Sequence, residues 1–109
     1  MAYTQNKALE LARSFLKQAC TNHPIRFAYL YGSYARGTQK EYSDIDIAVV
    51  LAEIAQTGNY VEEAFDIFHE AQEYNSLLEV ICLKKDEFEN NGGTIVSLIK
   101  KEGIRIDFL

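Results

Sequence analysis

The sequence predicts a single α/β or α+β domain in which helices flank a small mixed β-sheet. The 109 residues fit one small domain, expected to span residues 1–109, and the 48% hydrophobic content is enough for a core. Apolar stretches with helical spacing alternate with short runs of branched and aromatic residues. The expected order is helix, strand, strand, helix, strand, helix, strand, which is typical of helices packed on one sheet.

The first third of the chain predicts a helix, a strand and a short second helix. Residues 4–20 carry apolar side chains at helical spacing, and Thr4 is suited to be the N-cap. Residues 25–31, with the sequence IRFAYLY, have the composition of a strand. A short helix is expected at residues 33–37, because Gly37 would end it.

The middle of the chain predicts a strand and then a long helix. A polar loop at 38–43 leads to a strand at 44–51, which is apolar enough to be central in the sheet. Gly58-Asn59 breaks the chain before a helix at 60–74. One face of this helix is expected to carry its apolar residues, namely Val61, Ala64, Phe65, Phe68 and Ala71 or Gln72. The two phenylalanines are accordingly predicted to lie in the core.

The last third predicts a strand at 76–83 and a short acidic helix at 86–90. Asn91-Gly92-Gly93 is a strong break. A helix at 94–102 follows, and its expected buried residues are Ile95, Leu98 and Ile99. Residues 104–109 alternate enough to form a last edge strand.

Composition narrows the possible functions. The net charge of −5 and the pI near 5.0 argue against a general nucleic-acid binder, although a bound metal would still allow a nucleotide substrate. The N-terminus is polar and no apolar run reaches membrane-spanning length, so a cytoplasmic location is expected. Cys20 and Cys82 stand alone, and His23 and His69 join no Cys/His cluster, so a zinc site is not expected.

The stretch from 30 to 51 contains the residues best suited to chemistry. Gly32-Ser33 is followed, after ten residues, by Asp44-Ile45-Asp46 and an apolar run. Side chains alternate along a strand, so an Asp-x-Asp at its start places both carboxylates on one face. Carboxylate oxygens suit Mg²⁺, whereas the alternative is a pair of solvated caps. A Gly-Ser turn at the start of a helix offers N–H groups to a phosphate. Together they predict phosphoryl or nucleotidyl transfer.

Two further sets of side chains flank this stretch. Arg36 and Lys40 are candidates for contacts with a triphosphate, and the alternative for each is a solvated loop charge. Tyr29, Tyr31, Tyr34 and Tyr42 flank the motif, and one of them could stack on a nucleobase, although the sequence does not indicate which.

The string GSYARGTQKEYSDIDIAVV resembles the signature of the minimal nucleotidyltransferases, a prokaryotic branch of the DNA polymerase β-like superfamily. Ala35-Arg36-Gly37 and 43–46 (SDID) match it position by position, and the resemblance covers residues 25–83 well. It implies a palm-like nucleotidyltransferase fold. It also implies a third carboxylate on a neighbouring strand, for which Glu79 is the best match, although many members carry Asp there.

The resemblance implies a set of roles for these residues. Two Mg²⁺ ions would be held by Asp44, Asp46 and Glu79, and ATP would contact Gly32, Ser33 and Arg36. The implied partner is a HEPN-type toxin, to which the protein would transfer AMP on a tyrosine, acting as the antitoxin of the pair. Two alternatives stay open: a nucleotidyltransferase that modifies a small molecule, and a non-catalytic module that neutralises its partner by masking it.

Overall fold

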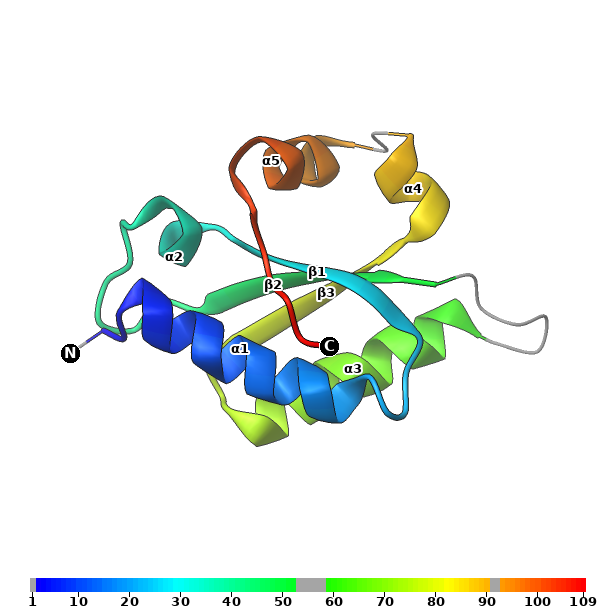
Figure 1. The fold of residues 1–109 in the computed structure, drawn as a ribbon, viewed down its shortest axis with the longest axis horizontal. Helices are drawn as coiled ribbons and strands as arrows, with labels where there is room; N and C mark the ends of the chain where they lie inside the picture. The colour runs from blue at the N-terminus through cyan, green and yellow to red at the C-terminus, as the bar shows by residue number, and fades with distance from the viewer. Residues whose placement is uncertain (1, 53–58, 91–92) are drawn as a thin grey trace.

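A mixed sheet in the order β3-β2-β1-β4 organises the protein (Figure 1). The computed structural model describes residues 2–52, 59–90 and 93–109. β1 pairs with β2 and β4 in antiparallel fashion, whereas β2 and β3 are parallel. The strands are β1 (Ile25–Tyr31), β2 (Ile45–Leu51), β3 (Leu78–Lys84) and β4 (Ile104–Arg105). The predicted mixed α/β architecture, with the 44–51 strand in the interior of the sheet, is confirmed.

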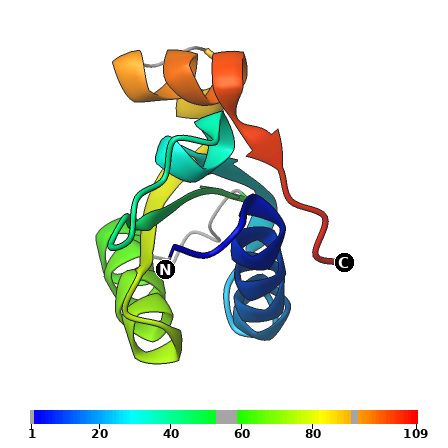
Figure 2. The same ribbon diagram turned by 90° about the vertical axis from the view of Figure 1, so that its left-hand side faces the viewer.

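Helices cover both faces of this sheet. They are α1 (Gln5–Ala19), α2 (Ser33–Arg36), α3 (Tyr60–Tyr74), α4 (Lys85–Glu89) and α5 (Thr94–Glu102). α1 and α3 lie side by side on one face, and α4 and α5 lie on the other (Figures 1 and 2). The apolar core is divided accordingly into a larger cluster under α1 and α3 and a smaller one under α5. No helix in the described ranges has the length and apolar character needed to cross a bilayer.

Alternation along β2 decides which of its residues meet which layer. Ile45, Ile47 and Val49 belong to the larger cluster, whereas Ala48 and Val50 belong to the smaller one. Because side chains two residues apart share a face, the side chain at position 46 lies on the α4/α5 face. The strand thus carries one acidic residue at the end of an otherwise buried apolar row.

Some predicted boundaries are corrected by the structure. β2 begins at Ile45, so Asp44 precedes the strand, and β3 begins at Leu78 rather than at 76. Only the first two residues of the expected 104–109 strand form a ladder with β1. After Arg105, the N–H of Ile106 still donates to the carbonyl of Ala28 in β1 at 2.9 Å, and Ile106 and Phe108 are buried in the larger core cluster. The predicted breaks at Gly58 and Asn91-Gly92 lie outside the described residues.

The predicted buried faces of two helices were wrong in part, although Ala71 and Ile99 are buried as predicted. In α3, Ile67 and Ala71 face the core, whereas Phe65 is 61% exposed and Phe68 is 37% exposed. In α5, Val96 is buried where Ile95 was expected. Both helices have more apolar positions than one core-facing stripe needs, and the sheet covers only one side of each.

A buried histidine joins the turn before β1 to α3. His23 is 8% exposed, and its Nδ1 lies 2.7 Å from Oε2 of Glu63. Its Nε2 lies 2.6 Å from Oε2 of Glu70. Burial disfavours the protonated imidazole, but hydrogen bonds with Glu70 and Glu63 and their negative charges outweigh that effect. The pKa of His23 is therefore raised above its ordinary value of 6.5.

This raised pKa predicts a pH-dependent stability. The His23 contribution to the free energy of unfolding should be complete below about pH 6.5 and should be lost as the pH rises through the folded-state pKa. His23→Gln should cost about 1–3 kcal/mol at the acidic end, and the difference from wild type should shrink at alkaline pH. Urea unfolding from about pH 5.5 to about pH 9 measures this. The exposed His69→Gln is the control, and parallel profiles for wild type and His23→Gln would contradict the prediction.

Candidate active site

The turn after β1 brings the chain against an acidic side chain of β2. Gly32 has φ = +73°, in the region that favours glycine, and it is the N-cap of α2. A Cβ built on Gly32 would lie 2.3 Å from Oδ2 of Asp46. This carboxylate therefore occupies the space that any other residue at position 32 would need. Ser33 is the first residue of α2 rather than its N-cap.

α2 is held in place by α1. The side-chain amide of Gln5 donates to the carbonyl of Tyr34 at 2.9 Å and to that of Ala35 at 3.3 Å. Tyr34 is buried in the larger core cluster, and Gly37 ends the helix in a left-handed conformation, as predicted. The Gly-Ser turn is thus fixed at both ends by packing and backbone geometry.

Strand register brings two predicted carboxylates side by side. Asp46 stands opposite Glu79 in the parallel β2–β3 pair and opposite Tyr31 in the antiparallel β1–β2 pair. Directly paired residues of adjacent strands point to the same face of a sheet. Asp44 directly precedes β2, its side chain is exposed, and it makes a side-chain hydrogen bond with Glu79. The three acidic residues, separated by up to 35 positions in sequence, are therefore neighbours.

The electrostatics reflect this gathering of negative charge. Burial and the charge of Asp44 raise the pKa of Asp46, and the positive charge of Arg36 opposes that rise. A side-chain hydrogen bond with Asp44, burial, and the charges of Asp44 and Asp46 raise the pKa of Glu79. Two carboxyl groups share a hydrogen bond only if one of them carries a proton. Because the carboxylates repel one another when ionised, a bound positive charge would stabilise the cluster.

Tyr31 completes the wall of this cluster. Its side chain is buried, and burial together with the charges of Asp46 and Glu79 raises the pKa of Tyr31 to about 12. The phenol therefore stays neutral at physiological pH. Its position directly before Gly32 places a hydroxyl group beside the carboxylates.

Asp44, Asp46 and Glu79 offer the type of ligand atom that Mg²⁺ binds, but their carboxylates do not converge on a single point. Carboxylate oxygens are the protein ligands that Mg²⁺ prefers, and one or two of them often suffice. Across residues 2–52, 59–90 and 93–109, however, no three His, Cys, Asp or Glu side chains are grouped tightly enough to hold a metal ion. The residues fit the ion by type and by adjacency, and the exposure of Asp44 and Glu79 leaves both side chains room to turn.

Of the two predicted phosphate contacts, Arg36 is near enough to Asp46 for its positive charge to act on that carboxylate. Nη1 of Arg36 lies 2.7 Å from Oε1 of Glu102 at the end of α5, and the guanidinium side chain is 45% exposed. Lys40 is exposed in the loop before Asp44. In that loop the backbone N–H of Lys40 donates to the hydroxyl of Ser43 at 2.8 Å, and the N–H of Ser43 donates to the Lys40 carbonyl at 3.0 Å.

Only one of the four candidate tyrosines presents an open ring. Tyr31 and Tyr34 are buried, and Tyr29 stacks on Phe88 with ring centroids 5.3 Å apart. Tyr42 is 84% exposed, two residues before Asp44. Of the four, Tyr42 is therefore the ring available to a nucleobase.

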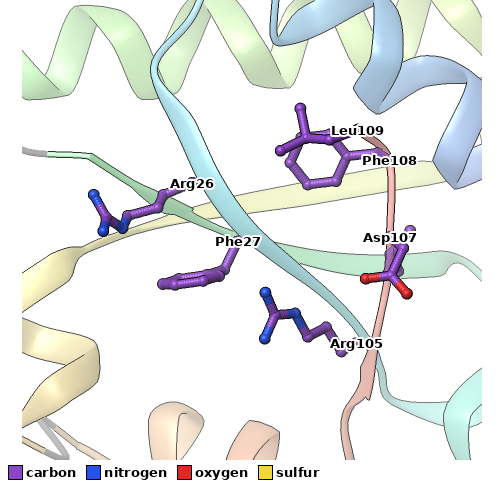
Figure 3. Close-up of a pocket in the computed structure, with 7 residues that line it drawn as sticks. Arg26, Phe27, Arg105, Asp107, Phe108 and Leu109 are labelled. Carbon is purple, nitrogen blue, oxygen red and sulfur yellow. The ribbon is translucent and has the colours of Figure 1, made fainter.

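A cavity of about 190 Å³ lies elsewhere, at the opposite end of β1. Its walls include Arg26 and Phe27 and the tail from Arg105 to Leu109 (Figure 3). The guanidinium carbons of Arg26 and Arg105 lie 5.7 Å and 4.8 Å from the Phe27 ring centre. Arg26 and Phe27 lie five and four residues along β1 from Tyr31, and Asp44, Asp46 and Glu79 are not among the residues that line this cavity.

Local sequence patterns did not indicate two residues that support this site: Gln5 positions α2, and Glu102 engages Arg36. Tyr31 was a candidate only for stacking on a nucleobase, whereas the structure places it beside the carboxylates. Its place at the end of a strand, directly before Gly32, is the signal for that second role. The partner of Arg36 is 66 residues away and has no local signal.

Comparison with known proteins identifies the class. The family described as Polymerase beta, Nucleotidyltransferase matches residues 15–106. A protein of Methanocaldococcus jannaschii named "Putative protein adenylyltransferase MJ1215" is 34% identical over 88 residues, covering 81% of this chain and 91% of that protein. The fold and these matches define a nucleotidyltransferase domain. The chain belongs to the Polymerase beta nucleotidyltransferase family.

Solved structures share the fold. One is a toxin–antitoxin complex with AMP-PNP, with a TM-score of 0.61 and 19% identity over 93% of this chain and 73% of that one. Another contains a tri-AMPylated Shewanella oneidensis HEPN toxin in complex with its MNT antitoxin, with a TM-score of 0.57 and 16% identity over 97% and 74%. At these identities the likeness shows the fold alone.

Proposed function

We propose that this chain is a Mg²⁺-dependent protein adenylyltransferase that transfers AMP from ATP to a tyrosine of a HEPN-type toxin and so acts as its antitoxin. The observation that carries the proposal is the pairing of Asp46 with Glu79 across β2 and β3, directly beside the Gly32 turn. A carboxylate cluster next to a Gly-Ser turn suits the binding of a metal–triphosphate complex.

The residues of the chain have distinct proposed roles. Asp44, Asp46 and Glu79 would hold two Mg²⁺ ions, which when bound neutralise the leaving pyrophosphate and activate the attacking hydroxyl. The N–H groups of the turn after Gly32 and the hydroxyl of Ser33 would bind the phosphates of ATP. Arg36 would leave its ion pair with Glu102 and bind a phosphate oxygen of ATP instead. A guanidinium can bind a carboxylate and a phosphate in the same bidentate geometry.

The choice of a protein as the acceptor rests on the relatives. The name of the M. jannaschii relative and the AMPylated HEPN toxin in a structural neighbour both support this choice. A cytoplasmic location suits an ATP-dependent reaction and agrees with the free thiols of Cys20 and Cys82.

Incubation with α-labelled ATP, Mg²⁺ and the product of the adjacent gene, which the proposal expects to be a HEPN-type protein, tests the proposal. We expect the label and the added mass of AMP on a tyrosine of that protein, and no label when EDTA removes the metal. A stable complex without label would favour a module that masks its partner. Label on an added small-molecule acceptor, and none on the protein, would favour a small-molecule nucleotidyltransferase.

A further inference from the structure

An exposed apolar stripe runs along the outer side of α3. We call it the α3 stripe, and it consists of Val61, Phe65, Phe68 and His69. Val61 is 72% exposed, Phe65 is 61% exposed and Phe68 is 37% exposed. The His69 ring packs edge-on against both phenylalanines, with centroids 4.3 Å from Phe65 and 6.0 Å from Phe68. Exposed clusters of aromatic side chains are typical of surfaces that bind another protein.

The stripe lies next to the open edge of β3, the strand that carries Glu79. The side-chain amide of Gln72 donates to the carbonyl of Leu78 at 2.6 Å, and the hydroxyl of Tyr60 donates to the carbonyl of Cys82. These two bonds attach α3 to β3, the edge strand of the sheet. A protein bound to the stripe would therefore adjoin the strand that lines the carboxylate cluster.

The charge beside the stripe restricts its partner. α3 contains Glu62, Glu63, Asp66, Glu70 and Glu73 and has no lysine or arginine. Glu63 and Glu70 contact His23, whereas the other three are exposed. Two copies of this chain meeting through α3 would bring like charges together, which opposes self-association. A partner with an apolar centre and a rim of lysine and arginine would complement the surface.

We infer that the α3 stripe is the docking surface for the protein that this chain modifies, and that the matching surface of that protein is apolar and basic. The inference rests on the proposed function, because it places the acceptor protein beside the proposed active site. Docking here would hold the acceptor near the β3 edge while its tyrosine reaches the face of the sheet that carries Asp46 and Glu79.

Calorimetric titration of the product of the adjacent gene, the proposed HEPN-type partner, into this chain tests the inference. Phe65→Ser with Phe68→Ser should raise Kd at least about tenfold, whereas Ile95→Ser, a change of an exposed apolar residue on α5, should leave Kd unchanged. Higher salt should weaken wild-type binding. Unchanged binding by the double variant, no binding by wild type, or self-association of this chain through Phe65 would each overturn the inference. Both changes are at exposed positions, and thermal unfolding verifies the fold.

Transfer assays on the same proteins separate the two proposals. If the wild-type protein bound its partner but transferred no AMP, and the double variant did not bind, the docking surface would be upheld and the adenylyltransferase proposal would be rejected. If the double variant transferred AMP at the wild-type rate even when the partner concentration is low, the docking surface would be rejected and the adenylyltransferase proposal would be upheld.

Discussion

Asp46→Asn is expected to lower the rate of AMP transfer by at least about a hundredfold, since loss of groups that merely orient metal ligands already costs about 10- to 100-fold. Asp46 is the half-buried carboxylate at the centre of the site, between Tyr31 and Glu79 and against Gly32. Asparagine has nearly the same shape but no charge, so it would fill the same space while weakening metal binding. Initial rates of label transfer at saturating ATP measure the effect.

Stability provides the internal check on this variant. Because burial and Asp44 raise the pKa of Asp46, the folded protein disfavours its charge, and the neutral amide should not lower the free energy of unfolding. Asp86→Asn, an exposed change on α4, is the matched control and should retain full transfer. If Asp46→Asn transferred AMP at the wild-type rate, the Asp46 carboxylate would not be needed for the reaction. Full neutralisation of the toxin by a variant without transfer would identify masking as the means of protection.

Gly32→Ala is expected to abolish most of the transfer activity and to destabilise the fold by about 1–3 kcal/mol. The added methyl group would meet the Asp46 carboxylate at 2.3 Å, and the backbone at φ = +73° is unfavourable for any L side chain. Asp46 would have to move away from Glu79, and the Gly-Ser turn would have to shift. Urea unfolding and initial-rate assays on one preparation report the two effects separately.

Gly37→Ala tests a glycine with positive φ at which an added methyl group meets no neighbour. Gly37 has φ = +76° and ψ = 20°, the left-handed helical conformation, whereas Gly32 has ψ = −153°, and a Cβ at Gly37 would meet no atom within 4 Å. This variant should lose about 1 kcal/mol of stability and keep its transfer activity. If both variants lost activity equally, the contact between Gly32 and Asp46 would not be the cause.

Local sequence patterns determined most of the secondary structure and the candidate residues. Thr4 caps α1 through a hydrogen bond from the N–H of Lys7, as its position before an apolar helical pattern predicts. The run 44–51 is apolar enough to be an interior strand, and it is one. These properties depend on neighbours within a few residues, so the sequence alone specifies them. The same holds for the spacing of Gly32-Ser33 and Asp44-Ile45-Asp46 that indicated nucleotidyl transfer.

Tertiary structure decided which surfaces meet. The apolar spacing of α3 allowed two faces to be buried, and the sheet covers the one that contains Ile67 and Ala71, leaving Phe65 to solvent. The pairing of Asp46 with Glu79 depends on the parallel register of β2 and β3, which α3 sets by crossing between them. Likewise, Arg36 meets Glu102 only because α5 returns over the same face of the sheet. Such contacts depend on the packing of whole elements, so no local pattern encodes them.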